Sequence, residues 1–217
     1  MQRAWIWLII ALPMIVVIGF FTLMLTDPGQ REARRAPTRT SGEALIGGPF
    51  TLVDQTGQTV TEADFRGRAM LIYFGYTYCP DVCPFSLQIM AAALEQLDPE
   101  ERARIQPILI TIDPQRDTVD QLAQYVASPA FPPDLVGLTG SEEQIADVAG
   151  VYRVAFRRSV GEDGQDDTGD DYLMDHSSIV YLMDSEGRFV DVFSHGADPQ
   201  SMAERLQEFL EEEGSSS

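Results

Sequence analysis

The chain has 217 residues and a formal net charge of −19 at pH 7, from 34 acidic and 15 basic side chains. So acidic a chain is a poor partner for the phosphate backbone of nucleic acid, and we expect no nucleic-acid partner. Once an apolar N-terminus and a short polar linker are set aside, about 170 residues remain, which suits one globular domain rather than two.

The N-terminus predicts a membrane anchor over residues 1–26. Residues 4–25 contain no charged side chain, and a run of this length suits a single membrane-spanning helix better than a cleaved signal peptide. Residues 27–43 are polar and rich in Pro, Gly, Thr and Arg, which is typical of a flexible linker. Arginines are more numerous after the span than before it, so charge alone would place the domain in the cytoplasm.

The first half of the predicted domain, which spans residues 44–213, alternates strands and a helix. Residues 50–60 alternate apolar and polar side chains about a turn and predict a hairpin. A continuous apolar run at 69–76 predicts a central buried strand, and apolar residues at helical spacing over 84–97 lead to a second buried strand at 105–112. This order predicts two parallel strands joined by a right-handed crossover.

The second half predicts two more helices, a short strand, a hairpin and a C-terminal helix. Thr118 with Gln121, and Ser141 with Gln144, form capping-box patterns that mark two helix starts. The other elements are a strand at 135–140, a hairpin of strands at 177–184 and 188–194, an amphipathic helix at 199–213 and a disordered tail at 214–217. The sum is an α/β fold with a mixed central sheet flanked by helices. Residues 161–171 hold six acids without the spacing of a calcium loop, and we expect a solvated loop.

Both cysteines of the chain lie in "YCPDVCP", and each is followed by a proline. A residue before proline is disfavoured in the α region, so we expect Cys79 and Cys83 in a loop and the helix to begin at Pro84. A helix N-terminus favours anions, which predicts a lowered pKa for Cys83. A disulfide across so short a loop would restrict the unfolded chain little, which disfavours a structural staple. A redox dithiol and a metal site both remain open.

A metal site would need a third ligand, because two sulfurs rarely complete the copper(I), zinc or iron–sulfur sites that soft thiolates select. The chain has two histidines. His176 comes just before an apolar strand, and in a mixed sheet a residue there can lie beside the end of the central strand. His195, at the end of the last predicted strand, is the competing candidate.

Four segments resemble, in order and separation, the Sco/SenC family of membrane-tethered copper chaperones for cytochrome c oxidase. They are "YFGYTYCPDVCP", "ILITIDPQRDT", "LVGLTG" and "MDHSSIVYLMD". The resemblance, over about residues 47–210, implies a thioredoxin-like fold and a copper ion held by the redox-active pair Cys79 and Cys83 and by His176. It also places Asp113 where it can help to organise the site, although Asp113 and Asp117 can equally serve only to fix a turn.

The resemblance also implies where the protein acts and on what. The N-terminal helix would anchor it in the inner membrane as a single-pass protein with its domain in the periplasm, against the arginine count. The recipient would be subunit II of cytochrome c oxidase with its dinuclear copper A centre, and other copper donors or thiol reductants would be further partners.

A thiol–disulfide oxidoreductase that reduces the recipient's cysteines, or a redox sensor, would use the same cysteine pair, so enzymatic activity is left open. Thioredoxins, however, have two residues between their cysteines and a cis-proline before the penultimate strand. This chain has three, and no proline between Pro133 and Pro199. A peroxidase would need Thr and Arg partners for its cysteine, which residues 61–70 do not supply. The sequence favours the copper chaperone.

Overall fold

The computed structural model describes residues 46–159 and 172–215. The expected membrane anchor, the linker and the acidic loop at 161–171 lie outside these ranges. Within them, no helix combines the length and the apolar character needed to cross a membrane. The described ranges contain both cysteines and both histidines of the chain.

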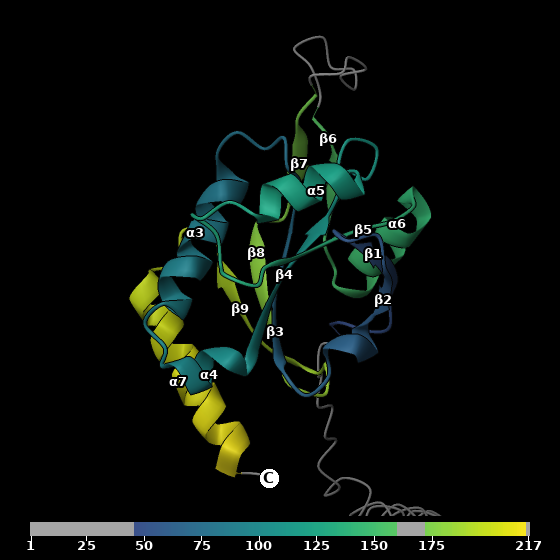
Figure 1. The fold of residues 1–217 in the computed structure, drawn as a ribbon. Helices are drawn as coiled ribbons and strands as arrows, with labels where there is room; N and C mark the ends of the chain where they lie inside the picture. The colour runs from purple at the N-terminus through teal and green to yellow at the C-terminus, as the bar shows by residue number, and fades with distance from the viewer. Residues whose placement is uncertain (1–45, 160–171, 216–217) are drawn as a thin grey trace, which may run out of the picture. The chain divides into compact units, whose positions relative to one another are not determined.

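A seven-stranded mixed sheet forms the centre of the domain, in the order β2-β1-β5-β4-β3-β8-β9 (Figure 1). β3, β4 and β5 run parallel, whereas β1 is antiparallel to β2 and β5, and β8 is antiparallel to β3 and β9. The strands are β1 Thr51–Asp54, β2 Thr59–Thr61, β3 Ala69–Gly75, β4 Ile105–Thr111, β5 Val136–Thr139, β8 Ile179–Met183 and β9 Phe189–Ser194. Both predicted hairpins and the parallel central pair are confirmed.

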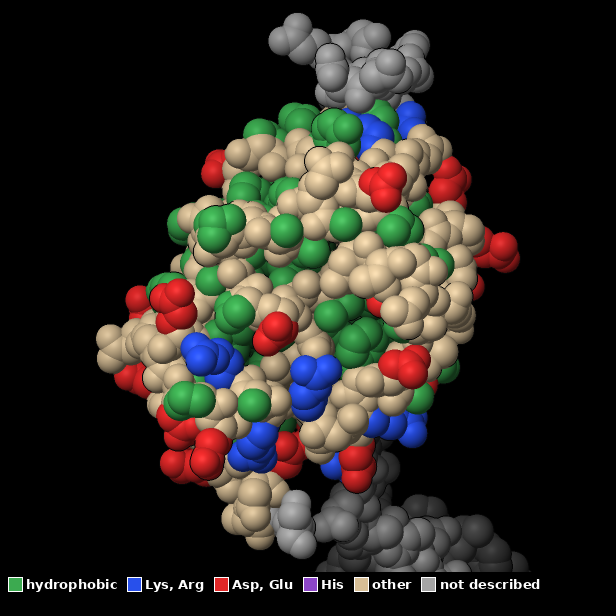
Figure 2. Space-filling model, viewed as in Figure 1, with side chains coloured by type: hydrophobic (Ala, Val, Ile, Leu, Met, Phe, Trp, Pro, Cys, Tyr) green, Lys and Arg blue, Asp and Glu red, His purple; other side chains and the backbone are tan. Residues whose placement is uncertain are grey.

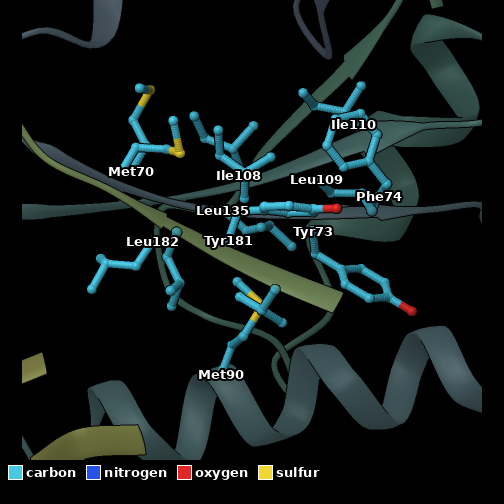
Figure 3. Close-up of a cluster of buried hydrophobic side chains, with 14 of the residues drawn as sticks. Met70, Tyr73, Phe74, Met90, Ile108, Leu109, Ile110, Leu135, Tyr181 and Leu182 are labelled. Carbon is cyan, nitrogen blue, oxygen red and sulfur yellow. The ribbon is translucent and has the colours of Figure 1, made fainter. Parts of the chain in front are cut away.

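The core lies on the two central strands. Every residue of β3 and β4 is buried, as expected of strands that read as continuous apolar runs because both faces of the sheet are covered. Figure 3 shows Met90 pointing from its helix, α3 (Val82–Leu94), toward the buried side chains of the sheet. The apolar stripe predicted over 84–97 is therefore the face that packs on the sheet.

Helices flank the sheet on both sides. α3 and α7 pack against one another and lie side by side (Figure 1). α5 packs on β5, where Gly137 leaves room for the side chains of Val126 and Leu122. Besides α3, the helices of the described ranges are η1 Glu62–Phe65, α4 Pro99–Ala103, α5 Val119–Val126, α6 Glu142–Val151 and α7 Pro199–Ser215. The last of these runs two residues into the expected tail.

Side-chain caps fix the starts of α5 and α6. Ser141 and Gln144 bond reciprocally, which confirms the capping box of α6. At α5, Thr118 accepts a hydrogen bond from the backbone N–H of Gln121. The side chain of Gln121 donates instead to the hydroxyl of Thr77 at 3.2 Å. The predicted capping box of α5 therefore forms only in part. The side chain of Gln121, which would have completed it, ties α5 to the loop that follows β3.

α3 begins at Val82 rather than at Pro84, so the prediction that Cys83 lies in a loop is wrong. The N–H of Phe85 already donates to the carbonyl of Asp81 at 3.1 Å. The first N–H groups of a helix have no partner within the helix, so Pro84 sits in the first turn without losing a hydrogen bond. Cys83 is held by the helix, and Cys79 remains in the loop.

Two short strands, which the sequence did not predict, form a separate two-stranded sheet. β6 (Phe156–Arg158) pairs antiparallel with β7 (Met174–His176), with Phe156 opposite His176. The short helices η1 and α4 were also not predicted. His176, expected in a loop, therefore lies on a strand outside the main sheet.

Candidate metal centre

The two cysteines and His176 converge beyond the carboxyl end of β3. Cys79 lies in the loop after this strand, Cys83 in the first turn of α3, and His176 at the end of β7. Gly75 permits the close approach, since a Cβ atom there would lie 3.0 Å from the Cys83 sulfur and 2.7 Å from the ring of Tyr73. Three separate elements thus bring two thiols and an imidazole to one place.

The distances between these groups are those of direct contact. The Cys83 sulfur lies 3.6 Å from Nε2 of His176. The backbone N–H of Cys83 donates to the Cys79 sulfur at 3.3 Å. Both cysteines are free thiols, and Cys83 is fully buried whereas Cys79 is partly exposed. Only one of the two sulfurs is therefore accessible from outside.

The imidazole of His176 has the tautomer of a metal ligand. Its Nδ1 lies 3.2 Å from the carbonyl oxygen of Ser177. A carbonyl only accepts, so we place the proton on Nδ1, and the lone pair of Nε2 faces Cys83. The rings of Tyr73 and Tyr76 meet the imidazole edge-on, at centroid distances of 6.2 and 6.1 Å. Metal-binding histidines are commonly oriented in this way, by a carbonyl on the other ring nitrogen.

The two thiols have pKa values shifted in opposite directions. The neighbouring Cys83 thiol contributes most to lowering the pKa of Cys79, and the side chain of His176 and the backbone N–H groups of Cys83 and Asp81 add to it. The hydrogen-bonded Cys79 sulfur and burial raise the pKa of Cys83. The prediction of a lowered pKa for Cys83 is therefore wrong, because burial beside a second sulfur outweighs the helix N-terminus. The negative charge belongs on the accessible Cys79.

An open cleft of about 310 Å³ gives access to the site, and Cys79 and His176 both line it. Leu173, which also lines the cleft, and Tyr78 beside Cys79 are about half exposed. A partner's side chain can therefore approach Cys79 and His176 through the cleft, whereas Cys83 lies behind them.

The donor set fits a soft metal ion in its chemistry, because two thiols and an imidazole with a free Nε2 lone pair are the ligands that copper(I) prefers. As the side chains stand, no three His, Cys, Asp or Glu residues within 46–159 and 172–215 are placed to hold a metal ion. Holding one would therefore require Cys79, Cys83 and His176 to draw together.

His195 lies apart from these three residues. Its ring packs on Phe85 of α3 at a centroid distance of 5.9 Å. No hydrogen bond between described residues joins it to Cys79 or Cys83. Of the two candidate histidines, the structure brings His176 to the cysteines.

Asp117 holds the loop that carries Cys79. Its carboxylate accepts from the backbone N–H of Thr77 at 3.0 Å, and from the hydroxyls of Thr77 and Thr111 at 2.6 Å each. Burial raises the pKa of Asp117, and these hydrogen bonds oppose the rise. Asp117, which the sequence predicted to fix a turn, therefore also holds Thr77, two residues before Cys79.

Asp113 contacts Arg116 and Tyr172 rather than the cysteines or the histidine. Its carboxylate accepts from Arg116 at 2.5 Å and from the hydroxyl of Tyr172 at 2.6 Å. The guanidinium of Arg116 lies over the rings of Tyr172 and Tyr78, at 3.5 and 4.7 Å from their centroids. The sequence analysis did not predict this cluster. Arg116 lies in the segment "DPQRDT" that resembles the family, but no motif or spacing pointed to Tyr172.

The SCO1/SenC family model matches residues 38–211 of the chain. The chain is 41% identical over 165 residues to the mitochondrial SCO1 homolog 1 of Arabidopsis thaliana, and 42% identical over 167 residues to protein sco1 of Schizosaccharomyces pombe. These alignments cover 76% and 77% of this chain, but only 47% and 62% of the two relatives.

The fold is also similar to that of solved structures. The structure of Bradyrhizobium japonicum ScoI with copper bound superposes with a TM-score of 0.66 at 39% sequence identity, and the match covers 76% of this chain and 99% of that one. The similarity therefore extends over essentially the whole of a solved domain that carries copper.

Proposed function

Because the chain belongs to the SCO1/SenC family, we propose that it is a copper chaperone that carries a copper ion as cargo on Cys79, Cys83 and His176. The observation that carries the proposal is the contact of 3.6 Å between the Cys83 sulfur and an imidazole nitrogen whose lone pair faces it. An isolated dithiol would need no such nitrogen. Two sulfurs and one nitrogen make a soft, three-coordinate site, and the thiolates of a partner can replace these ligands one at a time.

The proposed recipient is subunit II of cytochrome c oxidase and its copper A centre. The proposed location is the inner membrane, with residues 1–26 as a single-pass anchor and the domain in the periplasm. Support comes from the 22 uncharged residues at 4–25 and from the family to which the chain belongs.

Copper stoichiometry of the purified full-length chain tests the proposal. The reduced protein should bind one copper ion, and the protein with a Cys79–Cys83 disulfide should bind none, because a disulfide offers no thiolate. His176→Ala should weaken binding at least roughly tenfold, the loss expected when a metal shell is disturbed. The matched control His195→Ala should bind as the unaltered chain does. Full loading of Cys83→Ala, or equal losses in the two histidine variants, would contradict the proposal.

A thiol–disulfide oxidoreductase is the second candidate, and the accessible Cys79 with its lowered pKa favours it. Such an activity needs the cysteine pair but no imidazole on a metal ion, and His176 would enter it only through its share in lowering the pKa of Cys79. In cells that lack the native protein, His176→Ala should therefore fail to restore oxidase assembly at low copper if the protein carries copper. Full restoration by His176→Ala, with undiminished reduction of the recipient's disulfide, would replace the copper proposal by the reductase.

A further inference from the structure

Three buried hydroxyl groups, those of Tyr73, Ser86 and Tyr125, have no hydrogen-bond partner among the described residues. Buried polar groups are nearly always paired, so an orphaned one calls for an explanation such as a role in another state of the site. Tyr73 and Ser86 both lie close to Cys83, which Ser86 follows by one helical turn on α3. Two of the three orphaned hydroxyls, those of Tyr73 and Ser86, therefore lie beside the buried sulfur.

Tyr73 lies on β3 as part of the wall of the site. Its side chain is fully buried, and Figure 3 shows it extending from the central strand toward α3. Its ring and the Cys83 sulfur flank the same point beside Gly75, at 2.7 and 3.0 Å from where a Cβ would stand. The same ring meets His176 edge-on. Tyr73 therefore lies beside two of the three proposed copper ligands, Cys83 and His176.

The hydroxyl of Tyr73 is a permanent donor. A tyrosine hydroxyl has a pKa of about 10, so it is protonated at neutral pH and can donate. A thiol is a weak acceptor, whereas a thiolate is a strong one. In this structure Cys83 is a free cysteine, and the Tyr73 hydroxyl has no hydrogen-bond partner among the described residues.

We propose that the Tyr73 hydroxyl donates a hydrogen bond to the Cys83 sulfur when that sulfur becomes a copper ligand. As the copper–sulfur bond forms, the S–H bond of Cys83 breaks and its proton passes to solvent, and the sulfur is left with negative charge. A donor that is already in place then stabilises this charge without having to reorganise. Tyr73 is a positioning residue in this sense, and the inference rests on the proposed copper site.

Tyr73→Phe tests the inference because it keeps the ring and removes only the hydroxyl. In the full-length chain, copper(I) affinity measured by competition with a chromophoric chelator should fall roughly tenfold, a loss typical of a partner that supports a metal ligand. The sulfur-to-copper(II) charge-transfer band should move to longer wavelength, because the thiolate loses a stabilising donor. The stability of the metal-free reduced protein to urea should not fall, because the deleted hydroxyl had no partner.

Tyr125→Phe is the matched control, since it also removes an orphaned buried hydroxyl from a tyrosine, one that packs on Phe131. It should keep the affinity and the band of the unaltered chain. If Tyr73→Phe binds copper with unchanged affinity and an unchanged band, the inference is wrong and the copper site stands. If the unaltered chain takes up no copper, the proposed copper site and the inference about Tyr73 are both wrong. A loss of metal-free stability that accounts for the whole loss of affinity would also overturn the inference, because Tyr73 would then act only in folding.

Discussion

The two sulfurs of the site differ in exposure and in protonation, and we expect them to differ in reactivity. In the reduced native protein, iodoacetamide should modify Cys79 and spare Cys83, because the thiolate is the nucleophile and Cys83 is buried. The lowered pKa of Cys79 means that its modification should continue at pH values below the usual thiol pKa of about 8.5. Peptide mass spectrometry of the labelled native protein, which gives the rate for each cysteine separately, checks this.

The urea-unfolded protein is the control for that experiment, and both cysteines should react in it at similar rates with ordinary pH dependence. Equal protection of the two cysteines in the native protein would contradict the assignment of the charge to Cys79. The sequence could place both cysteines near a helix N-terminus. It could not show which one is buried, nor that a hydrogen bond between the two sulfurs shifts their pKa values in opposite directions.

Among the polar side chains described above, Asp117 is the one whose removal we expect to reduce the free energy of unfolding most. Asp117→Ala leaves three donors on Thr77 and Thr111 without their acceptor inside the protein. Unsatisfied buried donors cost about 1–3 kcal/mol each before relaxation, so we expect a loss of about 2–4 kcal/mol in the free energy of unfolding. Urea unfolding measures it, and a loss below about 0.5 kcal/mol would show that the network contributes little.

At the scale of the elements, the end of β3 has no room for a side chain at Gly75. Gly75→Ala places a Cβ between the Tyr73 ring and the Cys83 sulfur, so strand and helix must move apart. Such overpacking costs about 1–3 kcal/mol. The control is Gly150→Ala on α6, where nothing lies within 4 Å of the added Cβ and a gain of about 0.5–1 kcal/mol is expected. Thermal unfolding of both variants compares them, and equal effects would contradict the packing argument.

The elements that the sequence predicted well are those whose residues are buried in a regular pattern. β3 and β4 are buried throughout and largely apolar, and α7 shows an apolar face at helical spacing. β6 and β7 have three residues each and are half-exposed, so neither length nor alternation marks them. The start of α3 was misplaced because a proline permits a helix to begin before it as well as at it.

At the scale of the whole molecule, two arguments predict different locations for the domain. The arginine count favours the cytoplasm, and family membership favours the periplasm. We expect alkaline phosphatase fused at the C-terminus to be active, which requires export of the domain, and β-galactosidase fused there to be inactive. The opposite pair of activities would support the arginine count, which favours the cytoplasm.

The acidic excess is a property of the surface as a whole. Residues 44–217 contain 31 acids and 10 arginines, and Figure 2 shows acidic side chains around the edges of the face in view, with arginines beside several of them. Arg104, Arg188 and Arg205 each pair with a carboxylate. Exposed pairs of this kind contribute little to stability, and the acidic excess leaves most carboxylates of the domain without an arginine to pair with.

The unequal burial of the two sulfurs also leaves the proposed site open on one side only. An incoming thiolate can reach Cys79 through the cleft but cannot reach Cys83, which is fully buried. If the site holds copper as proposed, an incoming thiolate must approach the ion from the side of Cys79 and His176, and Cys83 is the ligand least open to replacement. The same asymmetry holds for redox chemistry, where a mixed disulfide would form on Cys79 and Cys83 would act as the resolving thiol. Ions and electrons would therefore be exchanged on the one side of the site that Cys79 and His176 expose.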